Sequence, residues 1–143
     1  MSVFMLFIMV ASAKAQPFLG TSFSFNSAEI QGGYATKNDV EFTVAYKTPF
    51  IRTDVASISS LTVGKKLWFS ESYSVTPAIG LAHYKIRDFN HPNEAGEATL
   101  ISSPSPVLRV ELGKNYKQGV VFALFNYCRN LSLTVGMKVY FKK

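Results

Sequence analysis

The sequence predicts an all-β fold in which eight antiparallel strands close into an up-and-down barrel, and three observations support this prediction. Apolar and polar residues alternate in many segments, as the side chains of a strand do when they point to opposite faces of a sheet. After residue 16 there are eight such segments, an even number, and turn-forming residues separate them. No stretch keeps the period of a helix.

The predicted strands have two different faces, one apolar and one made largely of small or polar residues. In chain order the strands are predicted at residues 17–25, 29–37, 40–48, 59–69, 73–86, 104–113, 119–127 and 130–141. The apolar face carries Leu19, Phe23 and Phe25 in the first strand, Val40, Phe42, Val44 and Tyr46 in the third, Leu61, Val63, Leu67 and Phe69 in the fourth, Tyr73, Val75, Ile79 and Leu81 in the fifth, Leu108, Val110 and Leu112 in the sixth, Phe122 and Leu124 in the seventh, and Leu131, Leu133, Val135, Met137, Val139 and Phe141 in the eighth.

The connections differ in length in a regular way. Those after the second, fourth and sixth strands are short, whereas residues 49–58 and 87–103 form long loops after the third and fifth. The connections after the first and seventh strands are short as well, so the asymmetry rests on two loops. Successive connections of a meander alternate between its two ends, so the long loops gather at one end. Short turns at one end, longer loops at the other and an even strand number are features of transmembrane barrels.

Residues 1–15 are predicted to be a secretory signal peptide. The apolar run from Val3 to Val10 is too short to span a bilayer as a helix, and Ala13-Lys14-Ala15 has the small residues of a cleavage site. A buried N-terminal strand or helix is the alternative. Residues 16–143 then form the barrel domain.

The composition excludes several functions. The formal charge of +6 is scattered, without clusters of Lys and Arg among aromatic residues, so we expect no nucleic-acid binding. Attraction to anionic lipid headgroups is compatible with this charge. The single Cys128 allows no internal disulfide, and two histidines match no zinc pattern, so we expect no metal or other cofactor.

The composition of the polar face indicates whether the apolar face of the sheet lies outside or inside the barrel. It is rich in small residues: Gly20, Gly33, Gly64, Gly80, Gly136, Ala35, Ala45, Ala78, Ala82, Ser22, Ser24 and Ser74. Glycine weakens a solvated strand, but the lumen of an eight-stranded barrel needs small residues beside large ones. We therefore expect the small face inside and the apolar face in lipid, with Trp68 lying over Gly64 and Tyr140 over Gly136. A soluble, lipocalin-like barrel, secreted or periplasmic, would have the opposite orientation and bind a small ligand.

Rolled this way, the lumen receives charges of both signs. A lumen network is predicted from Glu41, Lys66, Arg109, Glu111 and Lys138, because buried charges require partners. Arg109 and Glu111 are neighbours on one face. Lys47 lies at a strand end, where hydration at the rim is the preferred interpretation.

The outward face has aromatic residues near strand ends and one charge that conflicts with lipid contact. Such aromatic residues are typical of interfacial girdles: Phe25, Tyr46, Phe69, Tyr73 and Phe141. Alternation counted back from Phe69 puts Lys65 on the lipid side. Snorkelling of its ammonium group or a β-bulge would accommodate it.

The end of the chain carries a recognisable pattern. Thr134-Val-Gly-Met-Lys-Val-Tyr-Phe141 repeats the spacing of Thr62-Val-Gly-Lys-Lys-Leu-Trp-Phe69. It resembles the C-terminal strand signal of bacterial outer-membrane β-barrels. The resemblance implies an outer-membrane location, outer-membrane lipid as surroundings, and recognition by the barrel-assembly machinery. The assembly signal would be formed by Thr134, Gly136, Val139 and Phe141.

The expected function is that of a small outer-membrane barrel with a structural or surface-interaction role and a lumen packed by side chains. We expect that the protein is not an enzyme. A lipid-modifying barrel enzyme is the less favoured alternative, because the sequences around His83 and His91 match no hydrolase motif. In the lipid A deacylase family the catalytic His and Ser are two positions apart on one strand, whereas Lys85 stands two after His83, so the resemblance to that family fails. The partner of the loop at residues 87–103 is not specified by the sequence.

Overall fold

A computed structural model describes residues 15–50 and 54–141. It contains nine strands: β1 (Gln16–Phe23), β2 (Ser27–Ala35), β3 (Val40–Pro49), β4 (Val55–Lys65), β5 (Leu67–Trp68), β6 (Tyr73–Asp88), β7 (Thr99–Asn115), β8 (Gly119–Cys128) and β9 (Asn130–Tyr140). Apart from Ala15, the predicted signal peptide lies outside the described residues. Among the described residues there is no helix long and apolar enough to cross a membrane.

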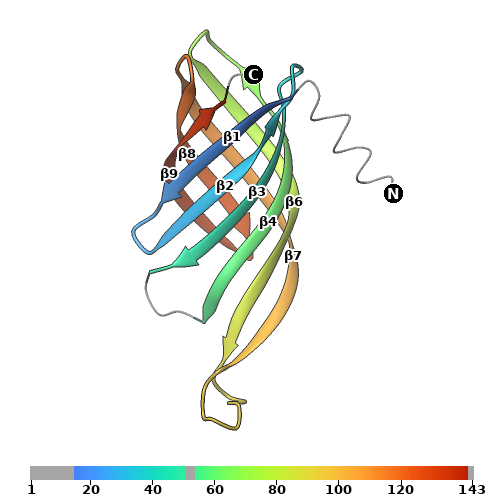
Figure 1. Ribbon diagram of the computed structural model, residues 1–143, viewed down its shortest axis with the longest axis vertical. Helices are drawn as coiled ribbons and strands as arrows, with labels where there is room; N and C mark the ends of the chain where they lie inside the picture. Colours follow the sequence, from blue (N-terminus) through green and yellow to red (C-terminus); the bar gives the residue numbers. More distant parts are fainter. Residues whose placement is uncertain (1–14, 51–53, 142–143) are drawn as a thin grey trace, which may run out of the picture.

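The strands form one closed antiparallel barrel. Their order is β4-β3-β2-β1-β9-β8-β7-β6-β5, and an additional pairing of β4 with β6 closes the sheet (Figure 1). β4 and β5 follow each other along the same edge of β6, from Gly64↔Ala78 to Leu67↔Val75, so they act as one interrupted strand of the wall. The wall thus has eight strands, and the predicted fold class is confirmed.

The hairpin of β6 and β7 is longer than predicted. Asp88 pairs with Thr99, whereas the pairing of β7 with β8 ends at Leu108↔Tyr127. Figure 1 shows the hairpin extending past the ends of the other strands. The part of β7 beyond β8 contains Pro104 and Pro106, which lack N–H donors and are tolerated where a strand has a free edge. The sequence predicts this strand only from residue 104, because residues 87–103 are rich in polar and turn-forming residues.

The sheet is rolled with its apolar face outward. Leu133 and Val135 of β9 are 54% and 60% exposed, whereas Thr134 between them is 3% exposed. Ser22 and Ser74 are likewise buried in the lumen. The soluble alternative requires the opposite orientation of these side chains.

One strand was assigned to the wrong faces. Phe122 and Leu124 of β8 were expected in lipid, but they are 2% and 1% exposed and face the lumen. Because residues 120–125 are apolar on both faces, alternation gives no direction there. The register decides it: Phe122 pairs with Gly136, and cross-strand partners lie on the same side of a sheet.

Aromatic rings cover two of the lumen glycines, but from neighbouring strands. A Cβ atom at Gly136 would lie 2.7 Å from Cζ of Phe122, and one at Gly33 would lie 3.0 Å from Cζ of Phe18. The expectation that Tyr140 covers Gly136 and Trp68 covers Gly64 is wrong: the nearest atoms to a Cβ at Gly64 belong to residues 76–78. Cross-strand neighbours are closer than residues four positions along the same strand, which explains the difference.

Lys65 was expected to face lipid, and its position at the end of β4 removes this conflict. β4 ends at Lys65 and β5 begins at Leu67, so the ladder is interrupted at Lys66. Lys66 is buried in the lumen, whereas Lys65 is exposed and its Nζ contacts the carbonyl oxygen of Asn38. That carbonyl belongs to the short turn after β2, so the ammonium group reaches the short-turn end of the barrel rather than the hydrocarbon.

The interior is layered along the barrel axis. Toward the long-loop end, Ala82, Tyr84, Val107 and Cys128 form one apolar cluster. Toward the short-turn end, Val120, Phe122 and Leu124 form another, with Tyr140 packed against it. Ionic side chains share the lumen with the second cluster: Lys138 pairs with Val120, and its Nζ lies 5.7 Å from the ring centroid of Phe122.

Candidate functional site

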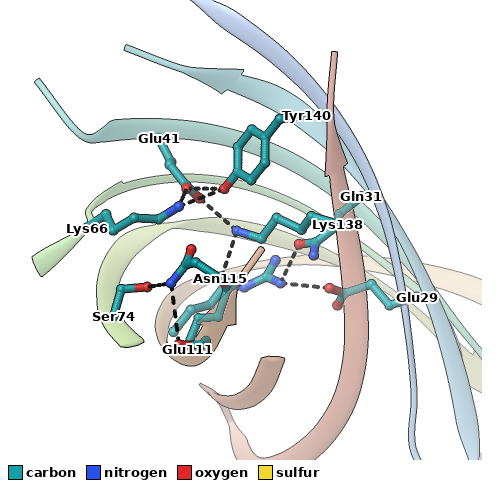
Figure 2. A network of polar contacts seen from close by, with 11 residues as sticks. Glu29, Gln31, Glu41, Lys66, Ser74, Glu111, Asn115, Lys138 and Tyr140 are labelled. Carbon is teal, nitrogen blue, oxygen red and sulfur yellow. Dashed lines mark hydrogen bonds and ion pairs between the residues drawn. The ribbon is translucent and has the colours of Figure 1, made fainter. Parts of the chain in front are cut away.

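The lumen contains an ionic cluster built around Glu41 of β3. Lys138 of β9 approaches Oε2 of Glu41 at 2.7 Å, and Lys66 approaches Oε1 at 3.0 Å. The hydroxyl of Tyr140 donates a hydrogen bond of 2.7 Å to Oε1 and accepts one of 2.8 Å from Lys66. Figure 2 shows these groups converging from different strands. Both oxygens of the carboxylate are therefore engaged.

Lys138 connects this cluster to a second carboxylate. Its Nζ lies 2.8 Å from Oε1 of Glu111 on β7, so one ammonium group bridges two carboxylates. Lys138, Glu41 and Glu111 are all buried. The structure thus brings together four of the five residues of the predicted lumen network, namely Glu41, Lys66, Glu111 and Lys138.

Arg109, the fifth residue, has a different set of partners. Its Nη2 lies 2.7 Å from Oε1 of Glu29 and donates a hydrogen bond of 3.1 Å to Oε1 of Gln31. Both partners belong to β2, across the lumen from β7. Glu29, Gln31 and the role of Tyr140 in this network were not predicted from the sequence. A signal was available, because Glu29, Gln31 and Gly33 alternate along one face of β2.

The fully buried charges of the described lumen balance, and half-buried Lys47, the cross-strand partner of Glu29, adds one further cation toward the long-loop end. Three carboxylates, Glu29, Glu41 and Glu111, face three cations, Lys66, Arg109 and Lys138, and all six side chains are buried. A cavity of about 20 Å³ is lined by residues of both ionic groups, the one around Glu41 and the one around Arg109. Side chains therefore fill the interior, as expected for an eight-stranded barrel.

Lys47 does not lie free at the rim. It is half-buried and its Nζ donates a hydrogen bond of 3.2 Å to the hydroxyl of Ser132 on β9. The hydrated position expected from the sequence is therefore only partly correct.

The outward surface carries aromatic residues at both ends. Phe25 and Tyr46 are exposed toward the long-loop end, and Phe69, Tyr73 and Phe141 toward the short-turn end. The rings of Phe69 and Tyr73 stack with centroids 6.1 Å apart. Between the two ends the outward face is apolar, which matches the band and girdles of a barrel embedded in lipid.

The histidines lie outside the lumen. His83 is exposed on the outward side of β6, and Lys85 follows it on the same side. His91 lies in the loop after β6, with Nδ1 2.8 Å from Oδ2 of Asp88. Among the residues that the structure describes, no three His, Cys, Asp or Glu side chains are grouped so as to hold a metal ion.

The residues of the predicted assembly signal divide between the two faces of β9. Thr134 is buried and Gly136 shares its lumen side, whereas Val139 and Phe141 are exposed outward. Phe141 lies just beyond β9, and its N–H donates a hydrogen bond of 2.9 Å to the carbonyl oxygen of Pro17. Recognition by the assembly machinery stays a prediction.

Solved structures with the same architecture identify the fold. The N-terminal β-barrel domain of OprF from Pseudomonas aeruginosa superimposes with a TM-score of 0.68 and 14% identity, covering 89% of this chain and 96% of that one. The outer membrane protein Ail of Yersinia pestis, studied in a phospholipid bilayer nanodisc, gives a TM-score of 0.54 and 16% identity over 90% of this chain and 99% of that one. The chain has the fold of the small outer-membrane β-barrels.

A third structure extends this likeness. Neisserial surface protein A superimposes on the barrel with a TM-score of 0.53 and 15% identity, covering 89% of this chain and 94% of that one. No protein-family model matches the sequence, and no curated protein matches it. The family resemblance and the outer-membrane location predicted from the sequence agree with these neighbours.

Proposed function

We propose that this small outer-membrane barrel has a structural or surface-interaction role and carries no wide pore. The observation that supports this most strongly is the contrast between its two faces: apolar side chains outside, and balanced ion pairs inside. Paired cationic and anionic side chains cross the lumen, and they leave no continuous aqueous path wide enough for a porin function.

The orientation follows from the connections. The short turns would face the periplasm, and the β6–β7 hairpin would project from the cell surface. Ail, one of the proteins with this fold, was also solved in complex with the heparin analogue sucrose octasulfate, with a TM-score of 0.52 to this chain. A surface-interaction role for the projecting hairpin is consistent with that precedent.

Labelling of single cysteines tests the membrane placement. In a Cys128→Ser background, Leu133→Cys and Val135→Cys should react with a membrane-soluble maleimide and not with a charged one. Thr134→Cys is the matched control on the lumen side and should react poorly with both, because its side chain is buried. Reaction of positions 133 and 135 with the charged reagent would exclude lipid contact.

Fractionation distinguishes this proposal from a soluble ligand carrier. The chain should remain with the outer membrane in high salt and after osmotic shock, and should leave it only with detergent. Its migration on a gel should change on heating, as closed membrane barrels migrate differently before and after unfolding. Release by salt or shock alone would contradict the proposal.

We also infer that the chain is not an enzyme. His83 and His91 lie on the outward wall and in a loop, apart from each other and from the lumen clusters. Cells that produce the chain should therefore show the same lipid A mass profile as cells that lack it. An altered profile that reverts in a His83→Ala, His91→Ala variant would support the lipid-modifying alternative instead.

A further inference from the structure

The mouth of the barrel at the short-turn end is a cavity with the size of a ligand site. Its volume is about 530 Å³. Small-molecule sites typically measure about 300–1,000 Å³ and occur in the mouths of β-barrels. Below it, the ion pair of Lys66 with Glu41 and the hydroxyl of Tyr140 close the lumen, so the cavity is a cup rather than the entrance to a channel.

The single tryptophan of the chain lines this cup. Trp68 pairs with Ser74, which is buried in the lumen, so the indole lies on the lumen side of the wall. It is nevertheless 48% exposed, because β5 ends beyond the packed interior. Tyr116, in the turn after β7, adds a second exposed aromatic ring. Half-exposed aromatic rings in a concave site offer a surface for stacking a ligand ring.

The charged residues of the cup are mostly basic. Among the described residues that line it, three are lysines, Lys37, Lys66 and Lys117, and one is an acid, Asp39. Lys66 is committed to Glu41, and its Nζ also lies 5.5 Å from the centroid of the Trp68 ring. Lys37 and Lys117 belong to two different turns at the rim and are exposed. Their ammonium groups suit an anionic group on the ligand.

We propose that this cup binds a small carboxylate that carries a ring, with the ring against Trp68 and the carboxylate near Lys37 and Lys117. The proposal rests on the proposed orientation only in stating which compartment supplies the ligand, namely the periplasm. A ring alone would lack the charge contact, and an anion alone would lack the stacking surface. Both elements are therefore needed for binding.

The emission of Trp68 provides a direct test on the full chain folded in detergent micelles. N-acetylmuramic acid is a suitable probe, because it differs from N-acetylglucosamine by its carboxylate-bearing lactyl group. We expect a saturable change in Trp68 emission with N-acetylmuramic acid, and at least tenfold weaker responses with N-acetylglucosamine and with inorganic phosphate. Equal responses to the three probes, or no saturable response, would overturn the proposal.

Variants separate this site from the rest of the protein. A Lys37→Gln, Lys117→Gln double variant should weaken the response to N-acetylmuramic acid at least fivefold. Lys85→Gln, on the outward side of β6 at the opposite end, should leave it unchanged. An equal effect of the two variants would refute local binding. A chain without heat-modifiable migration would refute the membrane barrel itself, whereas a heat-modifiable chain without a saturable response would refute only the site.

Discussion

Lys138 is the residue on which the lumen depends most directly. One ammonium group neutralises both Glu41 and Glu111, at 2.7 and 2.8 Å, in a buried environment. Breaking a buried ion pair by removing one partner costs about 3–5 kcal/mol, because the remaining charge loses its compensation. Replacement of Lys138 therefore leaves two carboxylates with less compensation.

We expect Lys138→Met to lower the free energy of unfolding by about 3–5 kcal/mol. Lys37→Met, at an exposed turn position, is the control and should change it by about 0.5 kcal/mol or less. Denaturant unfolding in lipid vesicles, followed by the emission of Trp68, measures both. If Lys138→Met lowered the free energy of unfolding as little as Lys37→Met, the lumen ion pairs would contribute little to stability.

Gly136 is required for steric reasons, apart from its place in the predicted strand signal. A Cβ atom there would lie 2.3 Å from the carbonyl oxygen of Thr21 and 2.5 Å from Cβ of Ser22. At Gly32 the nearest heavy atoms to such a Cβ are 3.6 Å away, which is ordinary contact. The two glycines thus differ in the space available to a methyl group.

Gly136→Ala should destabilise the barrel by about 1–3 kcal/mol through overpacking. Gly32→Ala should be neutral or stabilise it by up to about 1 kcal/mol. Unfolding of protein that was refolded without any assembly factor separates this steric effect from recognition of the signal. A stable Gly136→Ala barrel would assign the glycine to recognition alone.

The partners of the lumen charges could be anticipated from the sequence only in part. Alternation identified Glu41, Lys66, Arg109, Glu111 and Lys138 as inward, because each falls on the small-residue face of its strand. It could not reveal that Arg109 pairs with Glu29, 80 positions away along the chain. That choice depends on how the strands are staggered across the closed barrel, which no local pattern encodes.

At the scale of strands, β9 offers a depth series on one face. Leu131, Val135 and Val139 are all exposed outward along its length. A lipid-facing lysine costs about 2–4 kcal/mol at the bilayer midplane and about 0–1 kcal/mol near an interface. Position 135 lies near the middle of the strand, and the other two lie toward its ends.

We therefore expect Val135→Lys to be the most destabilising substitution of the three, with Leu131→Lys and Val139→Lys near neutral. Unfolding in vesicles measures the series. The same series in a water-facing strand would show no dependence on position, so a flat profile would count against a lipid-facing β9.

Strand patterns were informative where the two faces differ in chemistry. β9, β3 and β4 alternate cleanly, and their inward and outward sides were predicted correctly. β8 is apolar on both faces around Phe122, so its direction came only from the pairing with Gly136. The outer part of β7, residues 99–103, fell within the predicted loop because the segment after residue 86 is rich in polar and turn-forming residues, yet β6 supports it along one edge.

At the scale of the whole molecule, the closed interior predicts electrical behaviour. The six buried charged side chains are paired across the lumen, and the described cavity between them measures about 20 Å³. We expect no sustained large conductance when the protein is reconstituted into planar bilayers. Steady porin-like currents that disappear with denatured protein would contradict a packed lumen.

The architecture as a whole was accessible from the sequence because several levels agree. Strand number and the small-residue face indicate the same barrel, and the structure contains it. Of the two predicted long loops, the one at 49–58 is wrong, because β4 already begins at Val55, whereas a long connection remains between Asp88 and Thr99. The projection of the β6–β7 hairpin was not accessible, because its length depends on where β8 and β4 stop supporting it.

The pairing of β1 with β9, from Phe18↔Tyr140 to Phe23↔Val135, joins the first and last described strands. Cylinder formation must therefore wait until β9 has been translated and exported, and a product terminated before β9 can never seal. Because β1 and β9 are neighbours, a circular permutant that links these two strands and is opened in the tight turn after β8 should still yield a sealed cylinder.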